Sequence, residues 1–235
     1  MLVVGVGALG SVSAELLVRA GVGRVVLVDR DVVEATNLQR QMLYSEGDLG
    51  DPKAMSAARR LADIDGSVGV EPIVAHLDAE RARDLIPGVS AVVDGTDNFE
   101  TRYLLNDAAV AFDVPLVYGG AVGVAGTIMP VLPGVGPCLR CIADELPEQA
   151  GTCDTVGVLG PVVALVGARQ AAITLRLLLE GRASIEPVLE SVDGWSGRHR
   201  AIDVRAVKRA DCPCCAQRRY EYLDELANGG AVALC

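Results

Sequence analysis

The sequence predicts an α/β protein with a Rossmann-like, doubly wound and mostly parallel sheet that a mixed or antiparallel extension follows. Two observations lead to this prediction. Aliphatic runs that suit buried parallel strands alternate with helix-like segments over residues 1–120. A glycine-rich turn, "GVGALG", follows the first of these runs. Because aromatic residues make up only 3% of the chain and hydrophobic residues 51%, aliphatic side chains must build the core.

The first half of the chain consists of repeated strand–helix units. Strands are expected at residues 2–4, 24–29, 70–77, 89–95 and 114–120. Helices are expected at Ser11–Ala20, Pro52–Asp63, Ala79–Ile86 and Phe99–Ala111. Gly21 stops the first helix, and a proline in its favoured first-turn place opens the second. Right-handed crossovers would make these strands parallel.

After residue 120 the pattern changes. "AGTIMPVLPG" and "HRAIDVRAV" are strand-like and would extend the sheet in mixed or antiparallel fashion. A long apolar helix is expected between them, from Pro161 to near Gly181, with Arg169 and Arg176 on one face. We therefore predict a single domain over residues 1–235, with a nucleotide-binding half over about residues 1–120 and a second half over about residues 121–235.

Charge and hydropathy exclude two classes of partner. The formal net charge is −10 and there is no basic stripe, so general nucleic-acid binding is not expected. No uncharged apolar run reaches the 18 residues that a membrane span needs, and no secretory signal is present. A cytoplasmic location is therefore expected.

The first chemical motif is a nucleotide-binding turn. Gly5, Gly7 and Gly10 form G-x-G-x-x-G between a strand and a helix, where glycine allows a tight turn, close approach of a ligand and close helix packing. The free amides of the helix N-terminus suit an anionic group. Asp29 ends the second strand, where a carboxylate can bind ribose hydroxyls. These residues alone leave a nicotinamide or flavin cofactor, ATP, or an empty site open.

Three polar side chains after the second strand favour a triphosphate. Asn37 and Arg40 lie in "NLQRQ", and Lys53 follows in "GDPKA" at the start of a helix. Arginine binds phosphate oxygens in a bidentate fork, and lysine acts as a point charge. A nicotinamide cofactor would leave this pair of cations unexplained.

A second polar segment, "DGTDNFETRYLLN", follows the fourth predicted strand. Asp97 lies at the carboxyl edge of the sheet, where open α/β folds bind ligands, and a carboxylate beside a polyphosphate most often holds Mg²⁺. Asn98, Arg102 and Asn106 recur at four-residue spacing and share one helical face. The alternative is a solvated helix face that Asp97 caps.

The seven cysteines include two C-x-x-C pairs. Cys138 and Cys141 form the first pair, and Cys212 and Cys215 form the second, with Cys214 between them. Two such pairs predict a four-thiolate Zn²⁺ site, for which a disulfide or free thiols are the alternative. In the second motif, C-P-C-C, the outer cysteines have the spacing usual for zinc ligands. We therefore take Cys212 and Cys215, and not Cys214, as ligands.

These motifs together resemble the ThiF/MoeB/HesA adenylyltransferases, the prokaryotic relatives of ubiquitin-activating E1 enzymes. The resembling stretches follow in the family order over nearly all of the chain: "GVGALGS", "LVDRDVVEATNLQRQ", "LGDPKA", "DGTDNFETRYLLN", "PCLRC", "TCDTVGVLGPVVALVG" and "CPCC". The resemblance implies an enzyme that uses MgATP to activate the C-terminal glycine of a small ubiquitin-like sulfur carrier, such as ThiS or MoaD, as an acyl-adenylate. It also implies zinc at the two cysteine pairs.

The same resemblance implies roles for individual residues. Asp29 would hold the ribose and Asp97 the Mg²⁺, while the glycines would line the nucleotide. The phosphates would be held by Asn37, Arg40 and Lys53, and the other cofactor-binding residues would be Asp31 and Asn98. A carboxylate nucleophile needs no general base, and the only histidines, His76 and His199, lie in strand-like segments and are expected to be structural or surface residues.

Cys153 precedes the long apolar helix in "GTCDTVGVLGP". A thiol near a helix N-terminus has a lowered pKa and raised reactivity. The resemblance implies either a nucleophile that takes the acyl group or a persulfide, or, as in the MoeB branch, a thiol that adenylation does not require. We expect Cys153 to act in sulfur or acyl transfer. No role is assigned to Cys235.

The resemblance further implies a homodimer in which an arginine before the first strand reaches the partner's ATP. Because Met1 directly precedes strand residues, we expect the chain to be truncated at its amino end and possibly at its carboxyl end. Sulfur is expected to come from a separate donor, and the carrier to end in Gly-Gly. A NAD-dependent oxidoreductase and a non-catalytic scaffold that binds nucleotide or carrier remain the alternatives.

Overall fold

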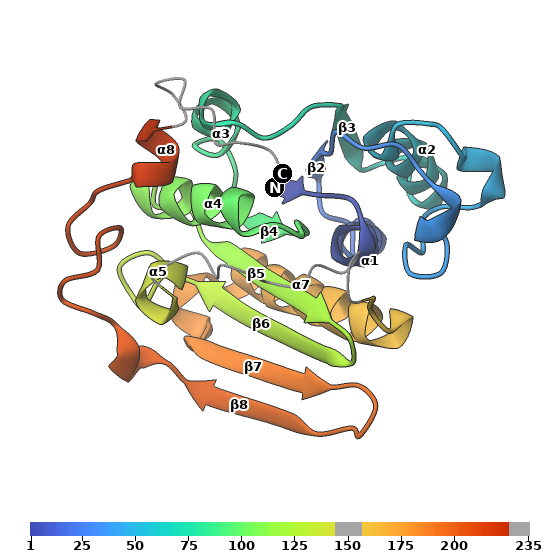
Figure 1. The fold of residues 1–235 in the computed structure, drawn as a ribbon. Helices are drawn as coiled ribbons and strands as arrows, with labels where there is room; N and C mark the ends of the chain where they lie inside the picture. Colours follow the sequence, from blue (N-terminus) through green and yellow to red (C-terminus); the bar gives the residue numbers. More distant parts are fainter. Residues whose placement is uncertain (144–156, 226–235) are drawn as a thin grey trace.

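The computed structural model describes residues 1–143 and 157–225, and in them it confirms the α/β class (Figure 1). The described strands form one eight-stranded sheet in the order β3-β2-β1-β4-β5-β6-β7-β8. Parallel pairing joins its first part: β1 (Leu2–Val4), β2 (Arg24–Val28), β3 (Gly69–Ile73), β4 (Val92–Asp94) and β5 (Leu116–Val122). Antiparallel pairing adds the extension: β6 (Ala125–Val131), β7 (Val188–Asp193) and β8 (His199–Asp203).

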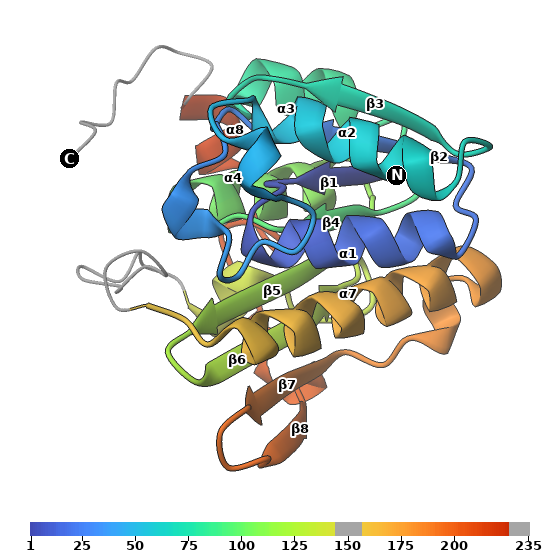
Figure 2. The same cartoon turned by 90° about the vertical axis from the view of Figure 1, so that its right-hand side faces the viewer.

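Helices cover both faces of the sheet, as a doubly wound fold requires (Figure 2). One face carries α1 (Ala8–Arg19), α2 (Lys53–Ile64) and α7 (Gly160–Glu180). The other face carries α3 (Ala79–Leu85), α4 (Phe99–Ala111) and α8 (Glu221–Glu225), with α5 (Leu139–Ile142) beside α4. Short 3-10 turns occupy Ala35–Asn37, Glu46–Asp48, Arg182–Ser184 and Arg205–Val207.

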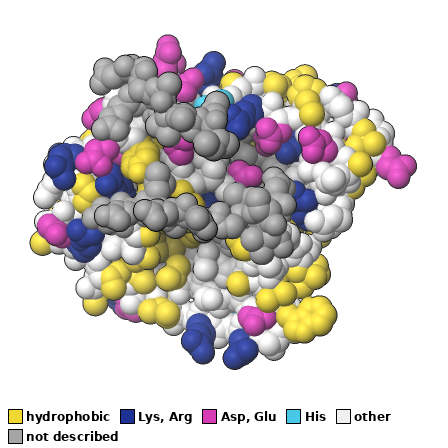
Figure 3. All heavy atoms as spheres, in the orientation of Figure 1, with side chains coloured by type: hydrophobic (Ala, Val, Ile, Leu, Met, Phe, Trp, Pro, Cys, Tyr) yellow, Lys and Arg dark blue, Asp and Glu magenta, His cyan; other side chains and the backbone are white. Residues whose placement is uncertain are grey.

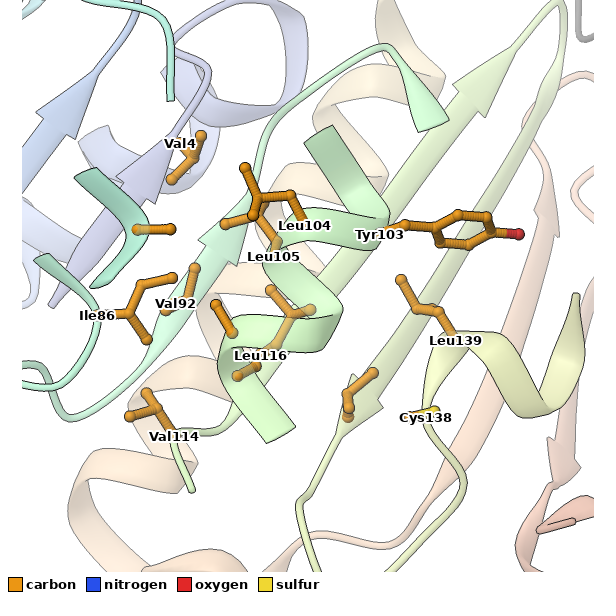
Figure 4. Packing of buried hydrophobic residues seen from close by; sticks show 14 of the residues in the cluster. Val4, Ile86, Val92, Tyr103, Leu104, Leu105, Val114, Leu116, Cys138 and Leu139 are labelled. Carbon is orange, nitrogen blue, oxygen red and sulfur yellow. The ribbon is translucent and has the colours of Figure 1, made fainter. Parts of the chain in front are cut away.

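The core has a layer on each face because strand side chains alternate in direction. Leu2 and Val4 of β1 pack toward α3 and α4, whereas Val3 packs toward α1 and α2. Figure 4 shows Leu104 and Leu105 of α4 packed near strand residues of the layer that faces α3 and α4. This packing holds the strand ends, and the loops that leave them, in fixed positions.

Several boundaries differ from the sequence prediction. Helix α1 begins at Ala8 instead of Ser11, and β3 ends at Ile73, four residues early. Residues 205–207, which were predicted to continue the last strand, form a 3-10 turn. Strand β7 was not predicted, because Glu190 interrupts its apolar pattern. This carboxylate is nevertheless buried, since Arg169 of α7 binds it at 2.6 Å.

Helix α7 is long and apolar enough, by length and composition, to cross a membrane. Its most apolar window is 50% buried, and Val162, Val166 and Ile173 lie in a core layer with side chains of α1, β5 and β6. Packing inside the fold therefore accounts for its apolar composition. The described residues contain no other helix that meets these criteria.

Candidate functional site

A cavity of about 310 Å³ lies at the carboxyl ends of β1, β2 and β4. Strand β1 pairs with β2 on one side and β4 on the other, so the chain reverses its direction of winding here. Open α/β sheets bind ligands at such a point. The cavity wall brings together most of the sequence-predicted cofactor residues: Gly5, Gly7, Asp29, Asp31, Asn37, Arg40, Lys53, Asp97 and Asn98.

The glycine turn has a steric origin. Gly5 has φ +78°, and a Cβ on Gly10 would lie 1.9 Å from the Gly5 carbonyl oxygen. Gly95, which leaves β4, fits equally closely, since its Cβ would lie 2.3 Å from the same oxygen. Gly10 thus permits close packing beneath the turn. It is not among the residues that line the cavity, and its predicted place beside the nucleotide stays a prediction.

Asp29 forms the acidic side of the cavity. One carboxylate oxygen accepts the Val6 N–H at 2.7 Å, and the other accepts the Asp31 N–H at 2.8 Å. Burial raises the pKa of Asp29, while these amides and the Lys53 charge oppose the rise. Each carboxylate oxygen has a further lone pair that a ribose hydroxyl could use.

The cationic side of the cavity carries Arg40 and Lys53, both buried. The Lys53 ammonium lies 3.1 Å from the Asp31 carboxylate, and the Lys53 N–H donates to the Asp31 carbonyl. One Arg40 nitrogen donates to the Thr36 carbonyl at 2.9 Å. The buried Asn37 side chain accepts the Glu34 N–H at 3.1 Å and fixes the turn from which Arg40 extends.

Asp97 and Asn98 lie in the loop between β4 and α4, and both are exposed. Asn98 caps α4, because its side-chain oxygen accepts the Thr101 N–H at 2.8 Å. This assignment corrects the alternative in which Asp97 was the cap. In the described residues no hydrogen bond to the Asp97 carboxylate occurs, so this carboxylate suits a cation that enters with a ligand.

Arg102 and Asn106 are buried, so the predicted helix face is not a solvated surface. The Arg102 guanidinium donates to the Thr96 carbonyl at 2.7 Å and lies 3.5 Å from the Asp94 carboxylate. Asp94 also accepts the Thr96 amide and hydroxyl. Burial raises the pKa of Asp94, and Arg102 and Thr96 oppose the rise. This pair fixes the loop that carries Asp97.

Gln170 is a residue that the sequence prediction missed. Its side-chain amide donates to the Asp94 carbonyl at 2.7 Å and to the Val117 carbonyl at 3.0 Å, where β4 and β5 separate. Its carbonyl accepts the Ser13 hydroxyl of α1 at 3.2 Å. A glutamine in an apolar helix is a weak sequence signal, and only the folded chain brings these partners together.

We expect Gln170→Leu to lower the free energy of unfolding by about 2–4 kcal/mol, because it leaves buried carbonyls without donors. Denaturant unfolding measures this change. The exposed Gln217 provides the matched control, and Gln217→Leu should change stability by less than about 0.5 kcal/mol. Equal effects of the two substitutions would show that the Gln170 contacts contribute nothing.

The sequence prediction did not assign some further cavity residues to the site, or it placed them in a different element. Arg30, Gln41 and His76 line the cavity. Gln41 is buried, and its side-chain carbonyl has no hydrogen-bond partner in the described residues. His76 lies in the loop after β3, not in a strand, and burial lowers its pKa. His199 is exposed on β8, 3.3 Å from Glu190 and far along the sheet order from this cavity.

The two cysteine pairs meet beside α4, and Cys138, Cys141 and Cys212 belong to the same core cluster as the buried residues of that helix. The sulfur atoms of Cys138, Cys141, Cys212 and Cys215 all lie within 4.8 Å of one another. Four thiolates around Zn²⁺ would have sulfurs roughly 3.8 Å apart, given Zn–S bonds of ~2.3 Å. The Cys138–Cys212 and Cys141–Cys215 distances of 3.6 and 3.4 Å exclude disulfides and fit such a site.

Cys214 lies beside this cluster. It accepts a hydrogen bond from Asn106 at 3.3 Å, and Asn106 also accepts the Leu139 N–H. A hydrogen bond with Cys214 is the main cause that lowers the pKa of Cys138, to about 5. Asn106 therefore couples α4 to both cysteine segments. Cys153 and Cys235 lie outside the described residues, so their predicted roles stay predictions.

Comparison with known proteins gives consistent matches. A family model described as "ThiF family" matches residues 1–214. The sulfur carrier protein ThiS adenylyltransferase of Bacillus subtilis is 43% identical over 235 residues, which cover 99% of this chain and 69% of that protein. The SAMP-activating enzyme E1 of Haloferax volcanii is 37% identical over 228 residues, covering 96% of this chain and 83% of that protein.

Solved structures match the fold. The crystal structure of E. coli MccB with ATP has a TM-score of 0.78 at 22% sequence identity. The match covers 91% of this chain and 65% of that one, so this chain spans less than two thirds of the MccB length. At this identity the likeness concerns the fold alone.

Proposed function

The chain belongs to the ThiF family, and from this membership we propose that it adenylates the C-terminal glycine of a small ubiquitin-like sulfur carrier, using ATP. The single observation that carries the proposal is the cavity in which Asp29, Arg40, Lys53 and Asp97 converge at the carboxyl ends of the strands. The names of the relatives supply the class of substrate.

The proposed reaction needs charge neutralisation and positioning more than proton transfer. A carboxylate oxygen of the carrier attacks the α-phosphorus, and the bond to the bridging oxygen breaks to release pyrophosphate. Arg40 and Lys53 offset the polyphosphate charge, and Asp29 orients the ribose. Asp31 and Lys53 hold each other in place at 3.1 Å, while Asn37 and Asn98 fix the backbone on either side.

Two metal ions belong to the proposal. Asp97 would hold Mg²⁺, which when bound would offset phosphate charge and so reduce repulsion of the attacking carboxylate. Cys138, Cys141, Cys212 and Cys215 would hold a structural Zn²⁺, because their sulfurs already converge. The zinc would tie the segment around residues 212–215 to α5.

The proposal extends to the remaining expectations from the sequence. We propose a cytoplasmic homodimer that receives sulfur from a separate donor, with Cys153 in the later transfer step. We also propose a single domain whose second half, about residues 121–235, contacts the carrier and holds the zinc. Support for this division comes from the described residues, where the nucleotide cavity lies almost wholly in the first half.

The test is ATP–pyrophosphate exchange with Mg²⁺, measured with and without a carrier that ends in Gly-Gly. Carrier-dependent exchange is the expected result. No exchange with any such carrier would contradict the proposal and favour the non-catalytic scaffold. Transfer of hydride to a nicotinamide cofactor would favour the oxidoreductase.

We expect Asp97→Asn to lower the exchange rate by about 100-fold or more, because the amide binds Mg²⁺ poorly. A higher Mg²⁺ concentration should recover part of this loss. The exposed Asp63 of α2 provides the control, and Asp63→Asn should leave both the rate and its Mg²⁺ dependence unchanged. A full rate for Asp97→Asn at low Mg²⁺ would exclude the proposed magnesium ligand.

A further inference from the structure

An apolar cavity of about 190 Å³ adjoins the nucleotide cavity. Its wall includes Phe99, Tyr103, Tyr118, Met129 and Leu189, and Ile142 of α5 lies at its rim. Arg102 lines both cavities and forms a shared wall. Its guanidinium carbon lies 5.3 Å from the ring centroids of both Phe99 and Tyr118, so two aromatic rings hold the cation in this position.

The apolar cavity continues as a row of side chains across the sheet. Tyr118 pairs with Met129 between β5 and β6, and Leu189 pairs with Ile202 between β7 and β8. The β6–β7 register ends with Ile128 opposite Glu190, so Met129 and Leu189 follow as the next neighbours. Residues opposite each other in antiparallel strands share a face. The row is therefore Tyr118, Met129, Leu189 and Ile202.

This row faces away from α7. Glu190 binds Arg169 of α7, and its neighbour Leu189 must point to the opposite face because strand side chains alternate. Leu189 is half-buried and Ile202 is 52% exposed, so the row becomes more accessible toward the edge strand β8. Figure 3 shows hydrophobic side chains exposed over the lower part of this face, where Figure 1 places β6 to β8.

The proposed reaction limits what can occupy this row. When a nucleotide occupies the first cavity, the attacking carboxylate of the carrier must approach from outside that cavity. The polar walls of the first cavity do not suit an apolar chain. The row begins at Tyr118, beside Arg102 in the wall shared with the nucleotide cavity, and ends at an accessible edge. A chain that lies along it would bring its carboxyl end toward the cation of Arg102.

We propose that the apolar cavity of Phe99, Tyr118, Met129 and Leu189 binds an apolar side chain of the carrier's C-terminal tail. This inference rests on the proposed function. Two terminal glycines have no side chains to fill a cavity, and alternate residues of an extended tail point in opposite directions. The side chain that enters is therefore that of the third or fourth residue from the carboxyl end. The cavity makes this enzyme selective for carriers with an apolar residue there.

The test uses a ThiS-type carrier that ends in Gly-Gly, prepared with leucine or aspartate at each of these two positions. Leu189→Asn places a polar group in the cavity wall, and Leu179→Asn makes the same change at a residue of α7 that is 83% exposed. The KM for carrier comes from ATP–pyrophosphate exchange, and carrier affinity is measured separately by calorimetry.

For the leucine carrier, Leu189→Asn should raise the KM by on the order of tenfold, the loss expected when a buried apolar side chain meets a polar group. The KM for ATP and the kcat at saturating carrier should not change. For the aspartate carrier, which binds poorly to the unchanged enzyme, the same substitution should have little effect. Leu179→Asn should behave as the unchanged chain does.

Three results would overturn the proposal. The first is an equal effect of Leu189→Asn on both carriers, and the second is an effect no larger than that of Leu179→Asn. The third is a change in assembly mass by light scattering without a change in KM, which would make the row a contact between copies of this chain. Carrier binding that depends on Leu189, without any exchange, would support the cavity assignment and contradict adenylation.

Discussion

Lys53→Ala is expected to lower kcat/KM for carrier-dependent ATP–pyrophosphate exchange by about 10²–10³-fold, the loss typical when one preorganised charged donor is removed. Lys53 is buried in the cavity wall and lies 3.1 Å from Asp31. Its removal leaves the Asp29 and Asp31 carboxylates without this cation where the polyphosphate is expected to bind. The negative charge of these carboxylates then repels the negative charge of the polyphosphate, which opposes binding.

The same substitution should change the pH dependence of exchange. Burial raises the pKa of Asp29, and the Lys53 charge is among the causes that oppose the rise. Without Lys53 the pKa of Asp29 rises further, so the carboxylate that orients the ribose is protonated at higher pH. The acidic limb of the pH–rate profile should therefore move to higher pH in Lys53→Ala. Lys53→Arg, which keeps the charge, should leave this limb in place.

Lys208 provides a matched control, because it is the only other lysine in the chain and is exposed. Lys208→Ala should leave both the rate and the pH profile unchanged. A rate for Lys53→Ala within a few-fold of the Lys208→Ala rate would remove Lys53 from the proposed phosphate site. Unchanged rates for both, with a normal dependence on carrier, would leave Arg40 as the main phosphate cation.

Cys141→Ser is expected to abolish stoichiometric zinc binding and to lower the melting temperature strongly. Zinc in small structural sites contributes on the order of 10 kcal/mol to folding, which is comparable to the ~5–15 kcal/mol net stability of a typical domain. Here the four sulfurs join the segment around α5 to residues 212–215, two chain segments that are far apart in the sequence. Metal analysis and thermal unfolding measure the two effects.

Cys214→Ser tests the choice of ligands. Cys214 is buried beside the cluster and accepts a hydrogen bond from Asn106, but it is not among the four converging sulfurs. This substitution should therefore keep one zinc per chain, with a smaller loss of stability. Loss of metal from Cys214→Ser but not from Cys141→Ser would reverse the assignment, and absence of zinc from the unchanged chain would exclude the site.

Residue types and spacing were sufficient for much of the nucleotide site. The turn through Gly5 and Gly7 and the carboxylates of Asp29 and Asp97 closely follow parallel strands, whereas Arg40 lies farther along the segment between β2 and α2, and Lys53 begins α2. Carboxyl ends of parallel strands share one edge, so residues just after them meet whatever the length of the helices between. For this reason the sequence predicted that the glycine turn and these two carboxylates lie close together, while the residue types of Arg40 and Lys53 indicated a phosphate site.

Most contacts beneath that site could not be predicted from the sequence. The close helix packing at Gly10 is an exception, because the glycine pattern predicts it and a Cβ on Gly10 would lie 1.9 Å from the Gly5 carbonyl oxygen. Gln170 lies 76 residues from its partner Asp94 and belongs to a helix whose other residues are mostly apolar. Arg102 was placed on a helix face, and only the packing of α4 decided that this face is buried.

The sequence by itself determined the α/β class, the glycine turn, several of the cavity's charged residues and the four cysteines that converge. Each of these depends on local spacing or on the common edge of parallel strands. The tertiary structure alone decided the sheet order, the existence of β7 and the apolar row from Tyr118 to Ile202. These depend on pairing and burial between segments far apart in the chain. A buried charge such as Glu190 interrupts the apolar pattern that predicts a strand. Only the folded chain shows that Arg169 on α7 pairs with it.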